Sequence, residues 1–308
     1  MANNYDVKEM YDDAVKLAKK VDFSNLNATE KSRFLNALGF GAKDFEKDFK
    51  KLLLSAIKEY HADLVNIGEG KDTDKFLSGN ALYKAANLTD DEKYTKAAKD
   101  LAANLKNVAR SSNEIFLDDK GEVSLKIAFN VLSFYMNYET KNGGKEHYND
   151  IIAQFNALYV NYFADIVLDL KNGDVSKFAD LIYFAAGLID TLEVMDQALY
   201  EIWAKLREFY KETIKAILSS ARFILGKDKE LDLMLAYAIF KGCRMNLLHT
   251  EKYECEAVTL FNYCLNTIDS LEDDDVNVKS AFILAASESV KNREYQDYGR
   301  GRGGVLWS

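Results

Sequence analysis

Apolar residues recur three, four and seven positions apart along almost the whole chain, and this spacing predicts amphipathic helices. Residues 94–105, 199–218 and 253–268 show the pattern well. Strand-like alternation of apolar and polar residues is nearly absent, so we expect an all-α fold. Clusters of Gly, Asn and Asp separate the periodic segments and supply the turns. About eleven or twelve helices are predicted in this way.

A tyrosine near the start of a helix marks an internal repeat. The segment DDEKYTKAAKDLA around Tyr94 is similar to GKEHYNDIIAQFN around Tyr148 and to HTEKYECEAVTLF around Tyr253, and Tyr200 lies between them. The spacings between successive tyrosines are 54, 52 and 53 residues. Each period has room for two helices, and we expect the tyrosine to dock the start of its helix against a neighbour.

The chain of 308 residues contains close to six such periods, which predicts six helical hairpins. An open superhelix and a closed ring can both be built from hairpins, but superhelical repeats are usually shorter, at roughly 34–47 residues. We therefore favour a single (α/α)6 toroid over residues 1–308, in which six outer helices surround six inner ones. Residues 296–308 are expected to form a Gly/Arg-rich C-terminal tail. The loops that enter the inner helices should meet at one mouth, which is the natural ligand site.

The composition is that of an acidic globular protein. The chain has 40 Lys+Arg, 49 Asp+Glu, a formal net charge of −9 and 48% hydrophobic residues. No block of basic residues is present, so nucleic acid is not an expected partner. The first fifteen residues lack the apolar core of a secretory signal, and no apolar run approaches the roughly 20 residues of a membrane helix. We expect a cytoplasmic protein without a membrane partner, and buried thiols rather than disulfides or a metal site at the three cysteines.

Four segments resemble parts of a known enzyme family, the first three its helix pairs and the fourth its C-terminal helix. They are GNALYKAANLTDDEKYTKAAKDLA, FAAGLIDTLEVMDQALYEIWAKLREFYKETIKAIL, MLAYAIFKGCRMNLLHTEKYECEA and NVKSAFILAASESVKN. They are similar to the unsaturated glucuronyl and rhamnogalacturonyl hydrolases of glycoside hydrolase families 88 and 105. The resemblance implies an (α/α)6 toroid and a hydrolase that acts on oligosaccharides with an unsaturated uronic acid end, derived from pectin or glycosaminoglycans. In that family an aspartate protonates the 4,5 double bond and activates water, and neither a metal nor an organic cofactor is needed.

The catalytic motifs of the family are altered in this chain. Its Trp-apolar-Asp stretch aligns with VSLKIAFNVL, which puts Ser124 at the Trp position and Lys126 at the Asp position. The segment FLDD, at Phe116–Asp119, matches the same Trp-apolar-Asp stretch more literally, and it would make Asp118 the carboxylate. The first-repeat aspartate of the family matches Asp74, five residues before Gly79. Asp74 and Asp118 are thus the candidate catalytic pair, and helix capping is the alternative interpretation of both.

The C-terminal string YGRGRGGVLWS contains a Gly-x-Gly-x-x-Gly pattern. No strand is predicted before it and no helix after it, which excludes a dinucleotide site. Arg300 and Arg302 are close in sequence to Trp307, and such a group can bind a uronate carboxylate and stack on its ring. These three residues are the predicted substrate-binding residues. The alternative is a flexible tail with Trp307 packed on the ring.

Two functional hypotheses follow. The first is an unsaturated uronyl hydrolase. The second is a non-catalytic toroid that binds sugar or serves as a scaffold, and it is kept because a lysine at the position of the catalytic aspartate is a poor acid.

Overall fold

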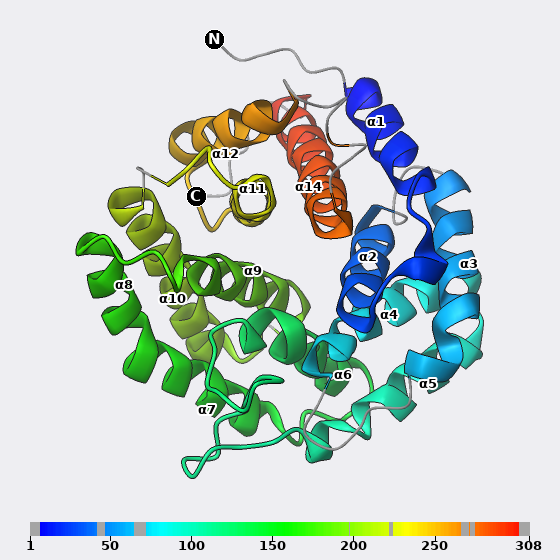
Figure 1. The fold of residues 1–308 in the computed structure, drawn as a ribbon, viewed down its shortest axis with the longest axis horizontal. Helices are drawn as coiled ribbons and strands as arrows, with labels where there is room; N and C mark the ends of the chain where they lie inside the picture. Colours follow the sequence, from blue (N-terminus) through cyan, green and yellow to red (C-terminus); the bar gives the residue numbers. More distant parts are fainter. Residues whose placement is uncertain are drawn as a thin grey trace.

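Two concentric rings of helices build the molecule (Figure 1). The computed structural model describes residues 7–41, 47–64, 72–196, 198–221, 224–265, 271 and 275–301. The inner ring consists of α2 (Ala28–Gly41), α4 (Ser78–Thr89), α6 (Ser133–Lys141), α9 (Phe178–Val194), α11 (Lys229–Arg244) and α14 (Val276–Gly301). The outer ring consists of α1 (Val7–Lys19), α3 (Lys47–Leu64), α5 (Glu92–Ala102), α7 (Tyr148–Leu158), α8 (Ala164–Lys171), α10 (Tyr200–Ser220) and α12 (Thr250–Leu265).

Outer and inner helices alternate along the chain, and the inner helices contact one another in sequence from α2 round to α14, which in turn packs on α2. The predicted (α/α)6 toroid is therefore confirmed. Short turns lie between the long helices: η1 (Phe23–Asn25), η2 (Thr73–Leu77), η3 (Leu105–Asn107) and the π-helical turns η4 (Ala128–Leu132) and η5 (Tyr159–Phe163). Within the described residues, β-structure is limited to one isolated bridge between Arg110 and Phe116.

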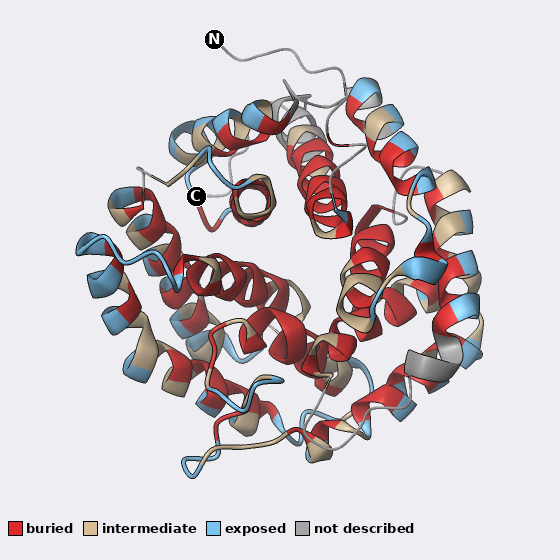
Figure 2. Ribbon diagram, in the orientation of Figure 1, coloured by how far each residue is buried: buried red, intermediate tan, exposed pale blue. Residues whose placement is uncertain are grey.

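Most of the described residues of the inner helices are buried, whereas the outer helices bury mainly one face (Figure 2). Helix α9 illustrates the inner type, because its sequence FADLIYFAAGLIDTLEV is apolar nearly all round and is buried from Phe178 to Leu192 except at Ala179. Helix α5 illustrates the outer type, with buried Tyr94, Ala98 and Leu101 on one face and charged residues on the other. A helix that is apolar all round fits only between two layers, which places α9 inside.

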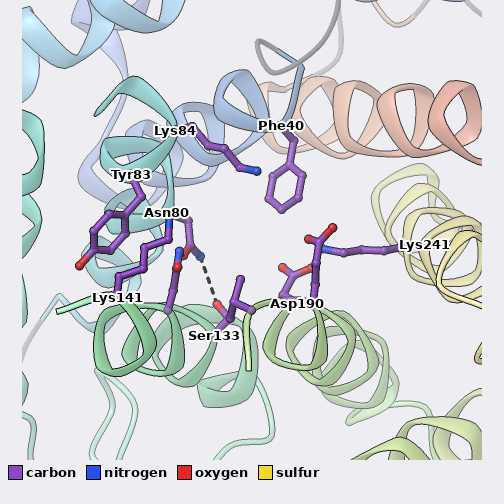
Figure 3. Close-up of a pocket in the computed structure, with 11 residues that line it drawn as sticks. Phe40, Asn80, Tyr83, Lys84, Ser133, Lys141, Asp190 and Lys241 are labelled. Carbon is purple, nitrogen blue, oxygen red and sulfur yellow. Dashed lines mark hydrogen bonds and ion pairs between the residues drawn. The ribbon is translucent and has the colours of Figure 1, made fainter. Parts of the chain in front are cut away.

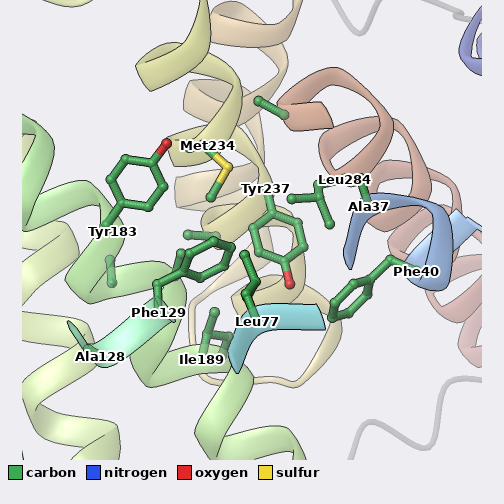
Figure 4. Packing of buried hydrophobic residues seen from close by; sticks show 14 of the residues in the cluster. Ala37, Phe40, Leu77, Ala128, Phe129, Tyr183, Ile189, Met234, Tyr237 and Leu284 are labelled. Carbon is green, nitrogen blue, oxygen red and sulfur yellow. The ribbon is translucent and has the colours of Figure 1, made fainter. Parts of the chain in front are cut away.

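The middle of the ring is filled by side chains from several inner helices (Figure 4). Phe129 of η4 packs against Tyr183 of α9, with ring centroids 5.5 Å apart. Phe40 of α2 meets Tyr237 of α11 edge to face at 5.8 Å. Aromatic pairs of this geometry add to the stability that burial of their apolar area provides.

Gly187 allows α9 to approach η4 closely. A Cβ atom on Gly187 would lie 2.3 Å from the carbonyl carbon of Ala128 and 2.4 Å from the backbone nitrogen of Phe129. Backbone atoms cannot move aside as a flexible side chain can, so this contact requires glycine. The position of η4, which directly precedes α6, therefore depends on the glycine at position 187 of the next inner helix, α9.

The four repeat tyrosines all lie in outer helices, as the 53-residue spacing suggests. Tyr94 and Tyr148 are buried at the starts of α5 and α7, where they dock the helix as expected. Tyr200 begins α10 but is 63% exposed and stacks on Trp203 instead. The repeat therefore predicted the position of the helices better than the contacts of each tyrosine.

One continuous helical stretch, Tyr148–Lys171, is long and apolar enough to cross a membrane by length and composition alone. The sequence analysis did not identify it, because polar residues interrupt its apolar runs. It comprises α7, η5 and α8 and forms part of the outer ring. There the Tyr159 ring stacks on the Phe209 ring of α10, with the ring centroids 3.9 Å apart.

Candidate functional site

Polar and charged side chains meet where the chain enters the inner helices, at the end of the ring that we call the amino-terminal mouth. Asp74 lies in η2 just before α4, Lys126 lies just before η4, and Glu230 lies in the first turn of α11. Arg33 of α2 and Tyr183 of α9 complete the group. These residues come from five parts of the sequence and are brought together only by closure of the ring.

Asp74 is a partly buried carboxyl group at this mouth. The Asn130 amide donates a hydrogen bond to its Oδ1 atom. Burial raises the pKa of Asp74 above its ordinary value, although the charge of Arg33 and a hydrogen bond with Thr29 act in the opposite direction. The nearby negative charge of Asp119 also raises this pKa. A carboxyl group with a raised pKa can donate a proton closer to neutral pH than an ordinary aspartic acid can.

Arg33 and Tyr183 both bind the same oxygen of Glu230. Arg33 Nη1 donates to Glu230 Oε1 over 2.8 Å, and the Tyr183 hydroxyl donates to that same atom. The guanidinium of Arg33 also lies over the Tyr183 ring, 5.0 Å from its centroid. Burial raises the pKa of Tyr183 well above its ordinary value, so the hydroxyl stays protonated and remains a donor.

Lys126 is a second cation at the mouth. Its Nζ atom lies 3.9 Å from Asp180 Oδ1 and 5.7 Å from the centroid of the Tyr183 ring, and its side chain is 38% exposed. Ser124 donates to the other oxygen of Asp180 over 3.0 Å. At 3.9 Å the contact with Asp180 is a loose ion pair, so the ammonium group can also bind an incoming anion.

Asp118 lies at the same mouth, but its side chain is used within its own turn. It accepts hydrogen bonds from the backbone nitrogens of Lys120 at 2.9 Å and Glu122 at 3.0 Å. Its neighbour Asp119 instead bonds to both the backbone nitrogen and the hydroxyl of Thr73, each at 2.7 Å. The structure therefore brings Asp119 next to the loop of Asp74. The motif FLDD contains both aspartates, and sequence reasoning had no means to separate them.

One of the predicted tail residues, Arg300, lies toward the opposite end of the ring. Helix α14 starts at the amino-terminal mouth, where Asn277 lies beside Arg33, and by Glu288 it has reached the last turn of α11. Arg300 lies twelve residues further on, in the last turn of α14, and its side chain is outside the described part of the chain. Arg302 and Trp307 also lie outside the described residues. Residues 296–301 of the expected tail continue the helix.

Sequence analysis did not single out Arg33 or Glu230. The available signal was the position of Arg33 inside the helix ATEKSRFLNALGFG, whose neighbouring residues Ser32, Phe34 and Leu35 are all buried. A charged residue among buried positions needs a partner of opposite charge. The partner, Glu230, is 197 residues away, and its identity required the structure.

The space at this mouth is small. A cavity of about 10 Å³ lies between Arg33, Phe129, Tyr183 and Met234, among other residues. A cavity needs roughly 10–15 Å³ of space open to the centre of a water-sized sphere to hold one water molecule, so this cavity has room for about one.

Solved structures of carbohydrate-active proteins match almost the whole chain. A glycoside hydrolase of family 105 from C. acetobutylicum ATCC 824 matches with a TM-score of 0.70 and 16% identity over 89% of this chain and 98% of its own. An unsaturated glucuronyl hydrolase specific for heparin matches with a TM-score of 0.71 and 11% identity, over 94% and 98% of the two chains. This chain has the glycoside hydrolase family 88/105 fold.

A family 88 glycosyl hydrolase from Bacteroides vulgatus gives the same result, with a TM-score of 0.69 and 12% identity over 94% of this chain and 100% of its own. No protein-family model and no curated protein matches the sequence. The resemblance that the helix-pair segments suggested is thus confirmed as a shared fold.

Proposed function

We propose that this protein acts on oligosaccharides that end in a 4,5-unsaturated uronic acid, as an unsaturated uronyl hydrolase with Asp74 as the proton donor. The observation that supports it is the position of Asp74, a carboxyl group with a raised pKa that lies at the amino-terminal mouth close to two cations, Arg33 and Lys126. Structural neighbours that include a heparin-specific unsaturated glucuronyl hydrolase favour a carbohydrate ligand of this kind.

The reaction consumes one water molecule. The Asp74 carboxyl group gives its proton to C4 of the sugar while a water oxygen forms a bond to C5, and the water then returns a proton to Asp74. The resulting hemiketal opens by breaking the bond between C5 and the ring oxygen, which leaves a ketone at C5. The hemiacetal formed at C1 then collapses to an aldehyde and releases the aglycone as an alcohol. Asp74 thus serves first as a general acid and then as a general base.

The two cations are suited to the carboxylate of the substrate. A uronate buried without a partner of opposite charge is costly, and Lys126 is the more exposed of the two. Arg33 becomes available when its contact with Glu230 opens, and its planar guanidinium can bind a carboxylate through two hydrogen bonds. Substrate entry and recognition are then one event, in which the uronate replaces Glu230 as the partner of Arg33.

The second candidate function is a non-catalytic toroid that binds sugar acids. One observation favours it: Lys126 stands where the resemblance to the family expects an aspartate. A protein of this kind would bind unsaturated uronides and leave their double bond intact.

Incubation with a panel of unsaturated disaccharides from pectin and from glycosaminoglycans tests both functions. The double bond absorbs ultraviolet light, so its hydration appears as a loss of absorbance, while calorimetry on the same samples measures binding. The proposal expects absorbance to fall with at least one disaccharide. Binding heat with constant absorbance would support the second function, and the absence of both signals would contradict the two together.

A further inference from the structure

A second cavity lies at the end of the ring opposite to Asp74, where several inner helices finish (Figure 3). It has a volume of about 50 Å³ and is lined by the ends of α2, α9 and α11, by α4 and by α6. At the same requirement of roughly 10–15 Å³ for each water molecule, this is room for about four. Lys141 lines the cavity and is also exposed, which places this side of the cavity at the surface, where a small molecule can reach it.

Two buried oxygen atoms on residues that line the cavity have no hydrogen-bond partner within the described part of the chain. They are Oδ2 of Asp190 on α9 and Oδ1 of Asn137 on α6, and the two residues are 4% and 6% exposed. The opposite atom of each side chain is already used. Lys241 donates to Asp190 Oδ1 over 2.6 Å, and the Asn137 amide nitrogen donates to Asn80 over 2.9 Å. Buried oxygen atoms without a donor are costly, so the cavity favours a molecule that forms hydrogen bonds with both.

The charged side chains around the cavity are engaged with one another. Lys241 is fully buried, and its Nζ atom lies 2.6 Å from Asp190 and 2.8 Å from Glu193. Burial acts to raise the pKa of Glu193, but the positive charges of Lys241, Arg244 and Lys84 hold this pKa well below its ordinary value. Lys84, which also lines the cavity, therefore belongs to the same network.

This network disfavours a charged ligand of either sign. An anion would meet the carboxylates of Asp190 and Glu193, and a cation would meet Lys241 and Lys84. Figure 3 shows how closely these groups surround the space, with Asp190 and Lys241 on one side and Lys84 above it. A neutral ligand does not have to compete with the existing ion pairs, so it is the class that the cavity accommodates at least cost.

A hydroxyl group suits Asp190 in either protonation state. Burial raises the pKa of Asp190, although the charge of Lys241 and its hydrogen bond act in the opposite direction. As a carboxylate Asp190 accepts a hydrogen bond at Oδ2, and as the neutral acid it donates one. A hydroxyl group both donates and accepts, whereas an ammonium group only donates. The chemistry of the lining therefore favours an alcohol over an amine.

We propose that this cavity is a binding site for a small neutral polyol of about the size of glycerol. One hydroxyl group of the polyol binds Asp190 Oδ2 and another binds Asn137 Oδ1, so that a single molecule replaces several water molecules. The rings of Phe40 and Tyr83 also line the cavity and offer apolar surface to the carbon atoms of the ligand. The site lies at the other end of the ring from Asp74 and does not depend on the function proposed above.

Equilibrium dialysis of the wild-type protein with radiolabelled glycerol tests this site. The proposal expects saturable binding of one glycerol molecule per chain. Unlabelled n-propanol keeps the carbon chain but has a single hydroxyl group, so it should compete at least about tenfold more weakly than unlabelled glycerol. Retention of glycerol that rises linearly with its concentration would show that the cavity holds water only, and equal competition by n-propanol would show that the buried oxygen atoms do not select the ligand. Either result would overturn the proposal.

Two variants locate the binding. Asn137→Leu replaces the acceptor on α6 by an apolar side chain of similar size, and the affinity for glycerol should fall about tenfold or more. Val194→Phe enlarges a partly buried side chain of the lining, and it should abolish binding because the new ring occupies the space. Circular dichroism and thermal unfolding check that each variant is folded.

Asn156→Leu is the matched control. The Oδ1 atom of Asn156 is also buried without a partner among the described residues, but it lies on the outer helix α7 and not in the lining of the cavity. This variant should keep the wild-type affinity for glycerol. If a folded Asn137→Leu or Val194→Phe protein binds glycerol as tightly as the control does, glycerol is bound elsewhere and the assignment of this cavity is wrong.

Discussion

Arg33 Nη1 lies 2.8 Å from Glu230 Oε1, although the two residues are 197 positions apart. The pair joins the second turn of α2 to the first turn of α11 at the amino-terminal mouth. Because Tyr183 of α9 donates to the same carboxylate oxygen, three inner helices meet at one atom. The contact therefore ties three inner helices together at the amino-terminal mouth.

We expect Arg33→Leu to destabilise the fold by about 1–3 kcal/mol, because it leaves the partly buried Glu230 carboxylate with one donor fewer. Urea denaturation measures the change in the free energy of unfolding. The pair Lys19–Asp48 provides the control: it is similarly short, at 2.7 Å, but both side chains are more than a third exposed, and Lys19→Ala should change stability by less than about 1 kcal/mol. Equal effects of the two substitutions would show that the Arg33 contact does not contribute as described.

Gly187→Ala should also destabilise the protein, by about 1–3 kcal/mol. Alanine normally stabilises a helix relative to glycine by about 1 kcal/mol, so the sign of the effect is informative. The expected loss arises because the new Cβ atom would collide with the backbone of Ala128 and Phe129 in η4. Thermal or urea unfolding of the variant measures it, and an increase in stability would mean that α9 and η4 are further apart than the structure shows.

The free energy of unfolding should rise as the pH falls from about 6 to about 4, because Asp232 takes up a proton in the folded state. Burial raises the pKa of Asp232 to about 6, although its carboxylate accepts hydrogen bonds from the backbone nitrogen of Gly226 at 2.9 and 3.1 Å. The ordinary pKa of an aspartic acid is 3.8, so the folded state takes up a proton in this range before the unfolded state does. Protonation therefore favours the folded state below about pH 6.

Asp232→Asn isolates this contribution, because asparagine resembles the protonated acid at every pH. The variant should be more stable than the wild type by on the order of 2 kcal/mol at about pH 7, and the two should converge at about pH 4. Urea denaturation at both pH values gives the comparison. A difference in stability that stays the same at the two pH values would contradict the raised pKa.

The periodicity of apolar residues and the tyrosine repeat were sufficient to predict the ring, because four outer helices, α5, α7, α10 and α12, begin near a repeat tyrosine and the 53-residue spacing gives room for a helix pair in each period. The candidate site was harder to predict from the sequence. Asp74 could be selected by its position before Gly79, but its raised pKa arises from burial in the folded ring and from the charge of Asp119, against the opposing charge of Arg33, and both residues are distant in sequence. Asp118 and Asp119 are adjacent in the chain, and only the turn geometry shows which of them points toward Thr73.

The rate of double-bond loss in Asp74→Asn tests the central claim most directly. Asparagine keeps the size and much of the hydrogen bonding of the side chain but has no proton to give, so kcat/KM on the best unsaturated disaccharide should fall by about 100-fold or more. Asp100→Asn, an exposed position on α5, should retain the wild-type rate. If Asp74→Asn hydrates the double bond as fast as the wild type, or if the wild type consumes none of the disaccharides, Asp74 is not the proton donor of an unsaturated uronyl hydrolase.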